Sequence, residues 1–184
     1  VFTRVNAGLG QHSIFPAANG GSLFVGSISN TSWGGGWIVD SATGAKRGFV
    51  PPPFQDVAFS PDGSEIAIMT WAGPLGGVRS NERIDIRSTR NGKLLRSFPT
   101  SGDESLVTLS WADGGLVAIL AKETTPETHR VEVEILDARS GERHPTGFQS
   151  TGWTLRVMGP TADGRVFIRE IESEARVVPA NRPR

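Results

Sequence analysis

The sequence predicts an all-β fold made of repeated four-stranded antiparallel units, and three observations support this prediction. A first turn glycine recurs at spacings of 43, 51 and 50 residues, as Gly20, Gly63, Gly114 and Gly164. A second turn glycine recurs at spacings of 48 and 49 residues, as Gly44, Gly92 and Gly141. The 184 residues also include 23 Gly and 12 Pro, which is typical of a chain with many turns and few helices.

The first two strands of each repeat are joined at the first turn. Residues 57–68 show the pattern best, with an apolar run, the turn Ser60-Pro61-Asp62-Gly63 and the apolar run Ile66-Ala67-Ile68. Asp-Gly and Asn-Gly pairs tolerate positive φ, so we expect two-residue hairpin turns here. Runs that are apolar throughout indicate strands buried on both faces, near the hub of the fold.

The third and fourth strands of each repeat follow. Residues 83–87 and 131–135 alternate between apolar and charged side chains, which indicates that one face packs and the other meets solvent. Fourth strands are expected at 47–50, at 94–98 and, weakly, at 142–144. Four strands in a repeat of this length predict the blades of a β-propeller.

A single propeller domain over residues 1–184 is expected. Its approximate blades are 12–50, 54–99, 105–147 and 152–179. The last blade lacks an outer strand, and residues 1–5 are a candidate closing strand, because closure removes an open seam. About four blades can form a small closed ring, part of a larger ring, or a half-ring that forms a homodimer.

Several of these motifs together resemble bacterial β-propellers of the WD-repeat and TolB-like type. They are the Phe-Ser-Pro-Asp-Gly turn at 59–63, Ile-Ala-Ile at 66–68, Ile-Asp-Ile-Arg at 84–87 and Asn-Gly-Lys at 91–93. No blade ends in a Trp-Asp pair; those positions hold Val39-Asp40, Ile86-Arg87 and Leu136-Asp137. The TolB-like resemblance is therefore the closer one, and it implies blade architecture without implying a ligand.

Charge and composition narrow the classes of partner and compartment. Lys and Arg total 19, as do Asp and Glu, and a neutral chain lacks the field expected of a nucleic-acid binder. The sequence has no membrane-length apolar run, which would need about 18–20 residues. The absence of Cys fits either the bacterial cytoplasm or an extracytoplasmic site. The chain opens with Val1, which leaves open that an upstream segment has been removed.

Catalytic and metal-binding patterns are weak. His12, His129 and His144 fall in three different blades without metal-ligand spacing. The chain has neither a Gly-x-Ser-x-Gly elbow nor a phosphate-binding loop. We therefore predict no catalytic residue, no cofactor and no metal, and we favour a protein that is not an enzyme.

Three long connections between second and third strands are expected on one rim, at 27–36, 70–82 and 121–130. Aromatic and Arg side chains often dominate binding interfaces, so this rim supplies the candidate binding residues Trp33, Trp71, Arg79, Glu123 and His129. The Gly-rich flanks are equally compatible with an alternative, in which Trp33 and Trp71 fold back and pack over the ends of the blades. The remaining tryptophans lie in strand patterns and are expected in the core, namely Trp37, Trp111 and Trp153.

The favoured function is a non-catalytic propeller that binds a protein or peptide on this rim. The alternative is the substrate-gating propeller of a larger hydrolase, such as a prolyl-oligopeptidase-like peptidase. A lyase or hydrolase with its site on the ring axis has little support from the scattered histidines. The identity of the partner is not encoded in any of these motifs.

Overall fold

The computed structural model describes residues 13–26, 35–72, 80–100, 104–112, 115–125, 128–150, 155–160, 165–170 and 176–179. Within these ranges the chain forms fifteen β-strands, and the antiparallel all-β prediction is confirmed. The described part of the chain contains no helix long and apolar enough to cross a membrane. Residues 1–5, the candidate closing strand, and Trp153 lie outside the described residues.

Each sheet is antiparallel and follows the order of the chain. The first sheet contains β1 (Ser13–Pro16), β2 (Ser22–Gly26), β3 (Gly36–Asp40) and β4 (Lys46–Val50). The second contains β5 (Phe54–Phe59), β6 (Glu65–Ala72), β7 (Ser80–Ser88) and β8 (Leu94–Pro99). The third contains β9 (Glu104–Ala112), β10 (Gly115–Thr125), β11 (Thr128–Leu136) and β12 (Arg143–Ser150). The fourth contains β13 (Leu155–Pro160), β14 (Arg165–Glu170) and β15 (Arg176–Pro179) among the described residues.

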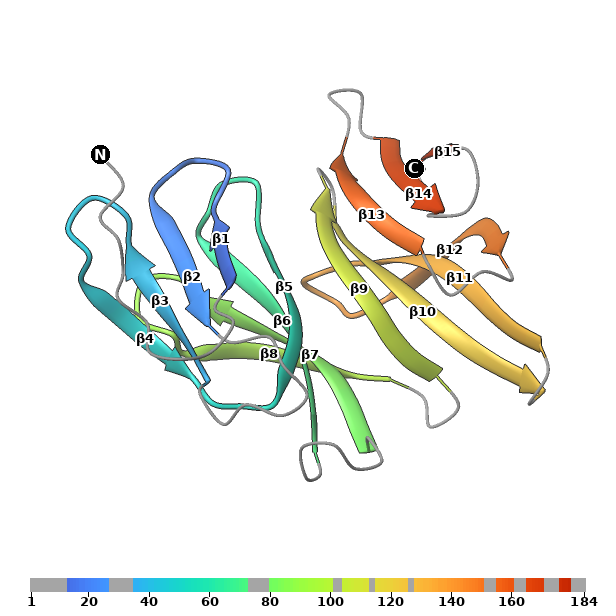
Figure 1. Cartoon of the computed structure of the whole chain (residues 1–184), viewed down its shortest axis with the longest axis horizontal. Helices are drawn as coiled ribbons and strands as arrows, with labels where there is room; N and C mark the ends of the chain where they lie inside the picture. The colour runs from blue at the N-terminus through green and yellow to red at the C-terminus, as the bar shows by residue number, and fades with distance from the viewer. Residues whose placement is uncertain are drawn as a thin grey trace.

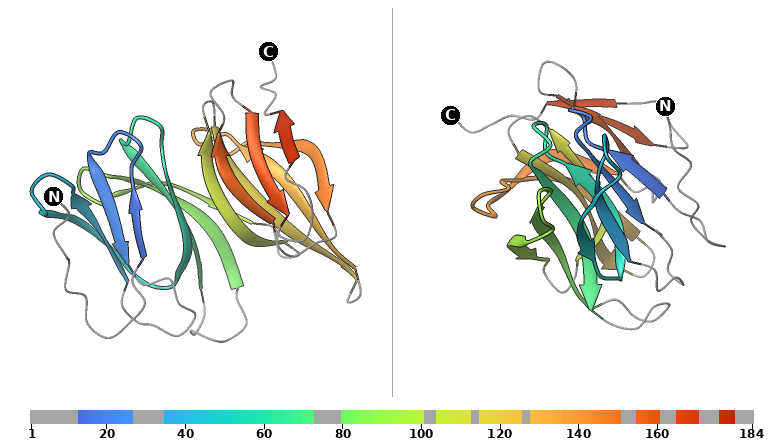
Figure 2. Two further views of the ribbon diagram at one scale, coloured as in Figure 1. Left: turned by 45° about the horizontal axis from the view of Figure 1, so that its top comes forward. Right: turned by 90° about the vertical axis from the view of Figure 1, so that its left-hand side faces the viewer.

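The sheets follow one another as an arc (Figures 1 and 2). The first strand of each sheet lies on the inner side, where β1 neighbours β5, β5 neighbours β9 and β9 neighbours β13. The last strand of each four-stranded sheet lies at the opposite edge of that sheet, and β4 is seen at the left of Figure 1. The first and fourth sheets are the two ends of the arc.

Apolar side chains fill the space between consecutive sheets. Between the first and second sheets the core consists of Phe24, Ile38, Val50, Phe54, Val57, Ile66 and Ile68. Between the second and third sheets the larger members are Met69, Ile84, Ile86, Leu106, Leu109 and Leu136, with Trp111 packed against them. Every residue from Ile66 to Trp71 is buried, which confirms that β6 is covered on both faces.

The first turn differs in length from the prediction in the second sheet, but it agrees with the prediction in the third sheet, where Ala112 pairs with Gly115 across two residues. The Gly63 N–H donates to the Ser60 carbonyl at 2.8 Å, and the Ser60 N–H donates to the Glu65 carbonyl at 2.9 Å. The loop therefore has four residues, 61–64, and not two. Gly20 and Gly63 adopt φ of 72° and 69°, so the expected positive φ is found. Ser60 and Asp62 close this longer loop with their side chains.

The second turn repeats with the same hydrogen bonds in three sheets. Gly44, Gly92 and Gly141 have φ of 73°, 73° and 78°, and each N–H donates at 2.9 Å to the carbonyl four residues earlier. In the first and third sheets that earlier residue is Asp40 or Asp137, whose carboxylate also accepts bonds from backbone N–H groups of the turn. Hydrogen bonds within the turn therefore explain why a glycine recurs at this position.

Two positions contradict the expected burial. Asp85, on the alternating strand β7, is only 3% exposed, because the second sheet is packed on both faces. Its carboxylate accepts hydrogen bonds from Ser97 at 2.8 Å, Arg83 at 3.2 Å and Arg87 at 3.4 Å. Conversely Trp37, which we expect in the core, is 36% exposed, because no described sheet covers the outer face of the first sheet.

Candidate functional site

The topology creates two rims of different character. Connections after the first and third strand of a sheet lie on one rim, which we call the turn rim, and connections after the second and fourth strand lie on the other, the connection rim. The turns described above close the turn rim tightly. On the connection rim, residues 27–35 join β2 to β3, and residues 73–79 join β6 to β7. This second rim carries the candidate binding residues.

The third long connection is not a loop. β10 runs to Thr125 and β11 starts at Thr128, so the predicted loop 121–130 is mostly an extended hairpin. Glu123 and His129 are register partners on its two strands. The prediction failed because the polar composition of this segment suits an exposed hairpin as well as it suits a loop. Trp33 and Arg79 lie outside the described residues.

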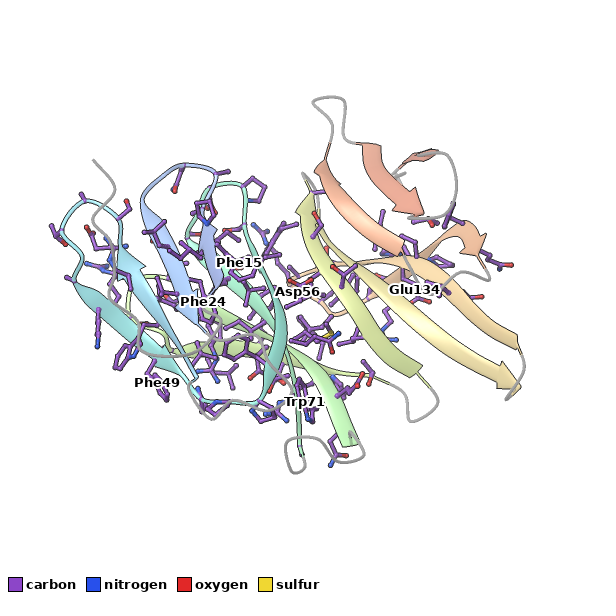
Figure 3. All side chains as sticks on the ribbon, in the orientation of Figure 1. Phe15, Phe24, Phe49, Asp56, Trp71 and Glu134 are labelled. Carbon is purple, nitrogen blue, oxygen red and sulfur yellow. The ribbon has the colours of Figure 1, made fainter. Side chains whose placement is uncertain are left out.

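Trp71 lies near the end of β6 at the connection rim and is 4% exposed (Figure 3). The pairing of β6 with β7 shifts here, since Thr70 pairs with Arg83 and Ala72 pairs with Ser80. Two residues of β7 therefore oppose one of β6, and Asn81 takes a φ of 52°. In this structure Trp71 is buried and does not offer an open contact surface.

Glu82 follows directly in this bulge and is 6% exposed. Its carboxylate accepts a hydrogen bond of 2.7 Å from the backbone N–H of Leu106 in β9. Its carbonyl accepts bonds from the N–H and the hydroxyl of Thr100, at 2.9 and 3.0 Å. Glu82 thus ties the second sheet, its exit segment and the third sheet together at the connection rim.

Asp56 makes a second tie between the same sheets, closer to the inner side of the arc (Figure 3). Its carboxylate accepts hydrogen bonds from the Thr108 hydroxyl at 2.6 Å and the Leu109 N–H at 3.0 Å. The pairing of β9 with β10 shifts between Leu106 and Thr108, which marks a bulge on β9. A bulge disturbs the ladder locally, and the two carboxylates bond the backbone on either side of it. Sequence reasoning missed both residues.

Several side chains of the turn rim form hydrogen bonds with the backbone of the turns. The Asn19 amide donates to the carbonyl of Asp62 at 2.6 Å, which links the first turns of two consecutive sheets. The Ser41 hydroxyl donates to the Gly20 carbonyl, and the Thr89 hydroxyl donates to the Gly63 carbonyl at 2.7 Å. These last two bonds join the two turns within the first sheet and within the second sheet.

The turn carboxylates are held in the ionised form. Hydrogen bonds from the Ser60 hydroxyl and from Ser64 lower the pKa of Asp62 below its usual 3.8. Bonds from Thr43, with a smaller effect of Arg47, lower the pKa of Asp40, and those from Ser140 and Arg139 lower that of Asp137. Acceptor-only groups with lowered pKa values suit turn stabilisation and not proton transfer near neutral pH. Among the described residues, no three His, Cys, Asp or Glu side chains are grouped to hold a metal.

Comparison with known proteins supports the fold. No protein-family profile matches the sequence, and no curated protein matches it significantly. The chain is similar to the β-propeller domain of the Trilobed protease from Pyrococcus furiosus, described as having an open velcro topology. The identity is 12%, the TM-score is 0.62, and the match covers 92% of this chain and 55% of that one.

Two further solved structures have the same fold. TolB from Acinetobacter baumannii is 16% identical with a TM-score of 0.55, over 90% of this chain and 40% of that one. U3-55K is 18% identical with a TM-score of 0.55, over 96% of this chain and 54% of that one. The chain therefore has the β-propeller fold, and it spans about half the length of these structures. The propeller and TolB-like fold predictions are confirmed at this level.

Proposed function

We propose that this chain is a non-catalytic propeller scaffold that binds a protein or peptide partner on its connection rim. The observation that carries the proposal is the contrast between the rims: one is closed by hydrogen-bonded turns, whereas the other carries connections on a buried base. Binding residues are often located on loops that a rigid scaffold positions. The proposed blades are 12–50, 54–99, 105–147 and 152–179, and β12, the last strand of the third sheet, ends at Ser150.

The base of the connection 73–79 is firm on both sides. Trp71 is buried before it, and Glu82 is buried and hydrogen-bonded after it. Loops anchored in this way lose less conformational entropy when a partner binds. We propose Trp33 and Arg79 as direct contacts, with Glu123 and His129 on the neighbouring hairpin. Trp71 supports the rim from below.

Binding can be tested with a library of short random peptides displayed on phage. Peptides selected on the wild-type chain are expected to lose affinity by about tenfold or more for Trp33→Ala and Arg79→Ala, because such anchors often contribute over 1 kcal/mol. Titration by fluorescence anisotropy with a selected peptide measures the loss. Trp71→Ala is unsuitable, since truncating a buried Trp costs about 3–5 kcal/mol of stability.

The matched control is Arg90→Ala. Arg90 is exposed on the turn rim, so its removal should leave peptide affinity unchanged. Failure to select any peptide, or equal losses for Arg79→Ala and Arg90→Ala, would contradict binding on the connection rim.

A second function is favoured by the similarity to the propeller domain of a protease. In this alternative the chain is the substrate-gating propeller of a larger hydrolase. The test is to read the full-length gene. A hydrolase domain encoded in the same reading frame supports the gating role, whereas a gene that encodes only propeller sequence excludes it.

A further inference from the structure

The face of the first sheet that points away from the second sheet carries a continuous apolar row. Ile14 pairs with Val25, Val25 pairs with Trp37, and Trp37 pairs with Phe49, so each of the four strands contributes one side chain. Ile14 is 56% exposed, Trp37 36% and Phe49 43%. The rings of Trp37 and Phe49 lie 4.9 Å apart, and the Lys46 ammonium lies 4.5 Å from the Trp37 ring centre.

The opposite face of the same strands is fully packed. Phe24, Ile38 and Val50 are at most 3% exposed and contact the second sheet. Phe24 lies edge-on against Phe54 of that sheet, with ring centres 5.2 Å apart. The first sheet is therefore apolar on both faces, but a described sheet covers only one of them. Apolar rows on two opposed faces are typical of a sheet that lies between two others.

The equivalent positions in the second sheet are covered by a neighbouring sheet. Ile14 and Val57 both lie six residues before the first turn glycine, and Val25 and Ile68 both lie five residues after it. Val57 and Ile68 are also register partners, and they are 5% and 0% exposed against the first sheet. In the second sheet, the equivalent residues therefore lie on the face that packs against the preceding sheet. The uncovered row lies on that same face of the first sheet.

We propose that a second copy of this chain covers the row, so that two arcs close one ring. The first sheet of each copy would pack against the fourth sheet of the other, since these sheets are the two ends of the arc (Figure 1). A two-fold axis makes this contact twice and leaves neither end open. Two copies would also be long enough for one ring, because one copy matches 55% of the propeller domain of the Trilobed protease.

The aromatic pair with Lys46 also resembles a platform for a small apolar ligand. The equivalence with Val57 and Ile68 favours a sheet as the occupant, because all four strands contribute to the row. A ligand platform would engage only the two outer strands. The two occupants predict different molar masses, which makes them separable.

Light scattering after size-exclusion chromatography tests the proposal. The wild-type chain is expected at twice 19.7 kDa, and Trp37→Glu combined with Phe49→Glu is expected at 19.7 kDa. The matched control is Leu94→Glu combined with Leu95→Glu. These two residues are each 43% exposed, like Phe49, but lie on β8 of the second sheet, so the dimer should persist. A wild-type chain of 19.7 kDa at all concentrations would overturn the proposal.

A thiol-labelling experiment covers the case in which the charged variant fails to fold. The chain has no Cys, so Val25→Cys introduces a single thiol within the row. Its reaction with a maleimide is expected to be slower in concentrated than in dilute protein, because dimerisation covers the row. A rate that does not depend on protein concentration would overturn the proposal.

Discussion

Asp56 accepts a hydrogen bond from the backbone N–H of Leu109, 3.0 Å away across the boundary between the second and third sheets. The two residues lie 53 positions apart in the chain. The same carboxylate also accepts the Thr108 hydroxyl. One carboxylate of β5 therefore fixes the inner strand of the next sheet beside its bulge.

Asp56→Ala is expected to lower the free energy of unfolding by about 2–3 kcal/mol, because a charge-assisted bond is lost and a backbone N–H is left without its acceptor. Urea unfolding followed by circular dichroism measures the change. Thr108→Val removes only the hydroxyl donor and should cost less, about 1 kcal/mol. Equal effects of the two substitutions would show that the bond to Leu109 contributes nothing.

Gly63→Ala and Gly44→Ala form a matched pair that isolates the contact between the first two sheets. Both glycines have positive φ, 69° and 73°, so each substitution carries a backbone cost of about 1–2 kcal/mol. A Cβ at Gly44 meets open space, whereas a Cβ at Gly63 would collide with the Asn19 amide. Gly63→Ala should therefore be the more destabilising in urea unfolding. A smaller effect at Gly63 than at Gly44 would contradict the close approach of the two turns.

Much of the fold could be predicted from the sequence because its landmarks are local. A glycine with positive φ, an Asp that accepts turn N–H groups and a run such as Ile66-Ala67-Ile68 each report their own surroundings. Their spacing then gives the repeat. The length of the first turn in the second sheet was not predictable in this way, since it depends on how Ser60 closes the loop with Glu65.

The candidate site was harder to predict from the sequence than the fold, for two physical reasons. The bonds of Asp56 and Glu82 cross to another sheet, so no local pattern marks them. The exposure of Trp37 depends on whether a further sheet is present, which its strand pattern does not reveal. Segment 121–130 was misassigned because polar strands of an extended hairpin resemble a loop in composition.

Acid is expected to weaken the turn rim. The lowered pKa values of Asp40, Asp62 and Asp137 mean that the unfolded chain takes up protons at a higher pH than the folded chain does. The stabilisation is present above the unfolded value of 3.8 and is lost as pH falls through the lowered folded values. Urea midpoints should therefore drop when pH is lowered from about 6 to about 3.

The triple variant Asp40→Asn, Asp62→Asn and Asp137→Asn isolates this contribution. Asn keeps a side-chain oxygen that accepts turn N–H groups, so the turns should form, but it does not titrate. Its urea midpoint should fall less between the two pH values than that of the wild-type chain. An equal fall in both proteins would assign the acid sensitivity to other groups.

Asp85 places a charge on a face of the second sheet, and the equivalent face of the first sheet is apolar. Asp85 and Trp37 both lie seven residues before the second turn glycine, and both belong to the row that faces the preceding sheet. Asp85 is 3% exposed and is held by Ser97 and two arginines. Asp85→Ala should cost about 3 kcal/mol, because it leaves the half-buried guanidinium of Arg87 without its carboxylate.

The double variant Asp85→Leu with Arg87→Met separates the charge effect from packing. Replacing a buried ion pair with apolar side chains of similar volume is often neutral or stabilising, so this variant should unfold at a higher urea concentration than Asp85→Ala does. If the double variant is the less stable of the two, the site depends on the shape of its hydrogen-bond network. If Asp85→Ala costs less than about 0.5 kcal/mol, the pair does not hold β7 in place.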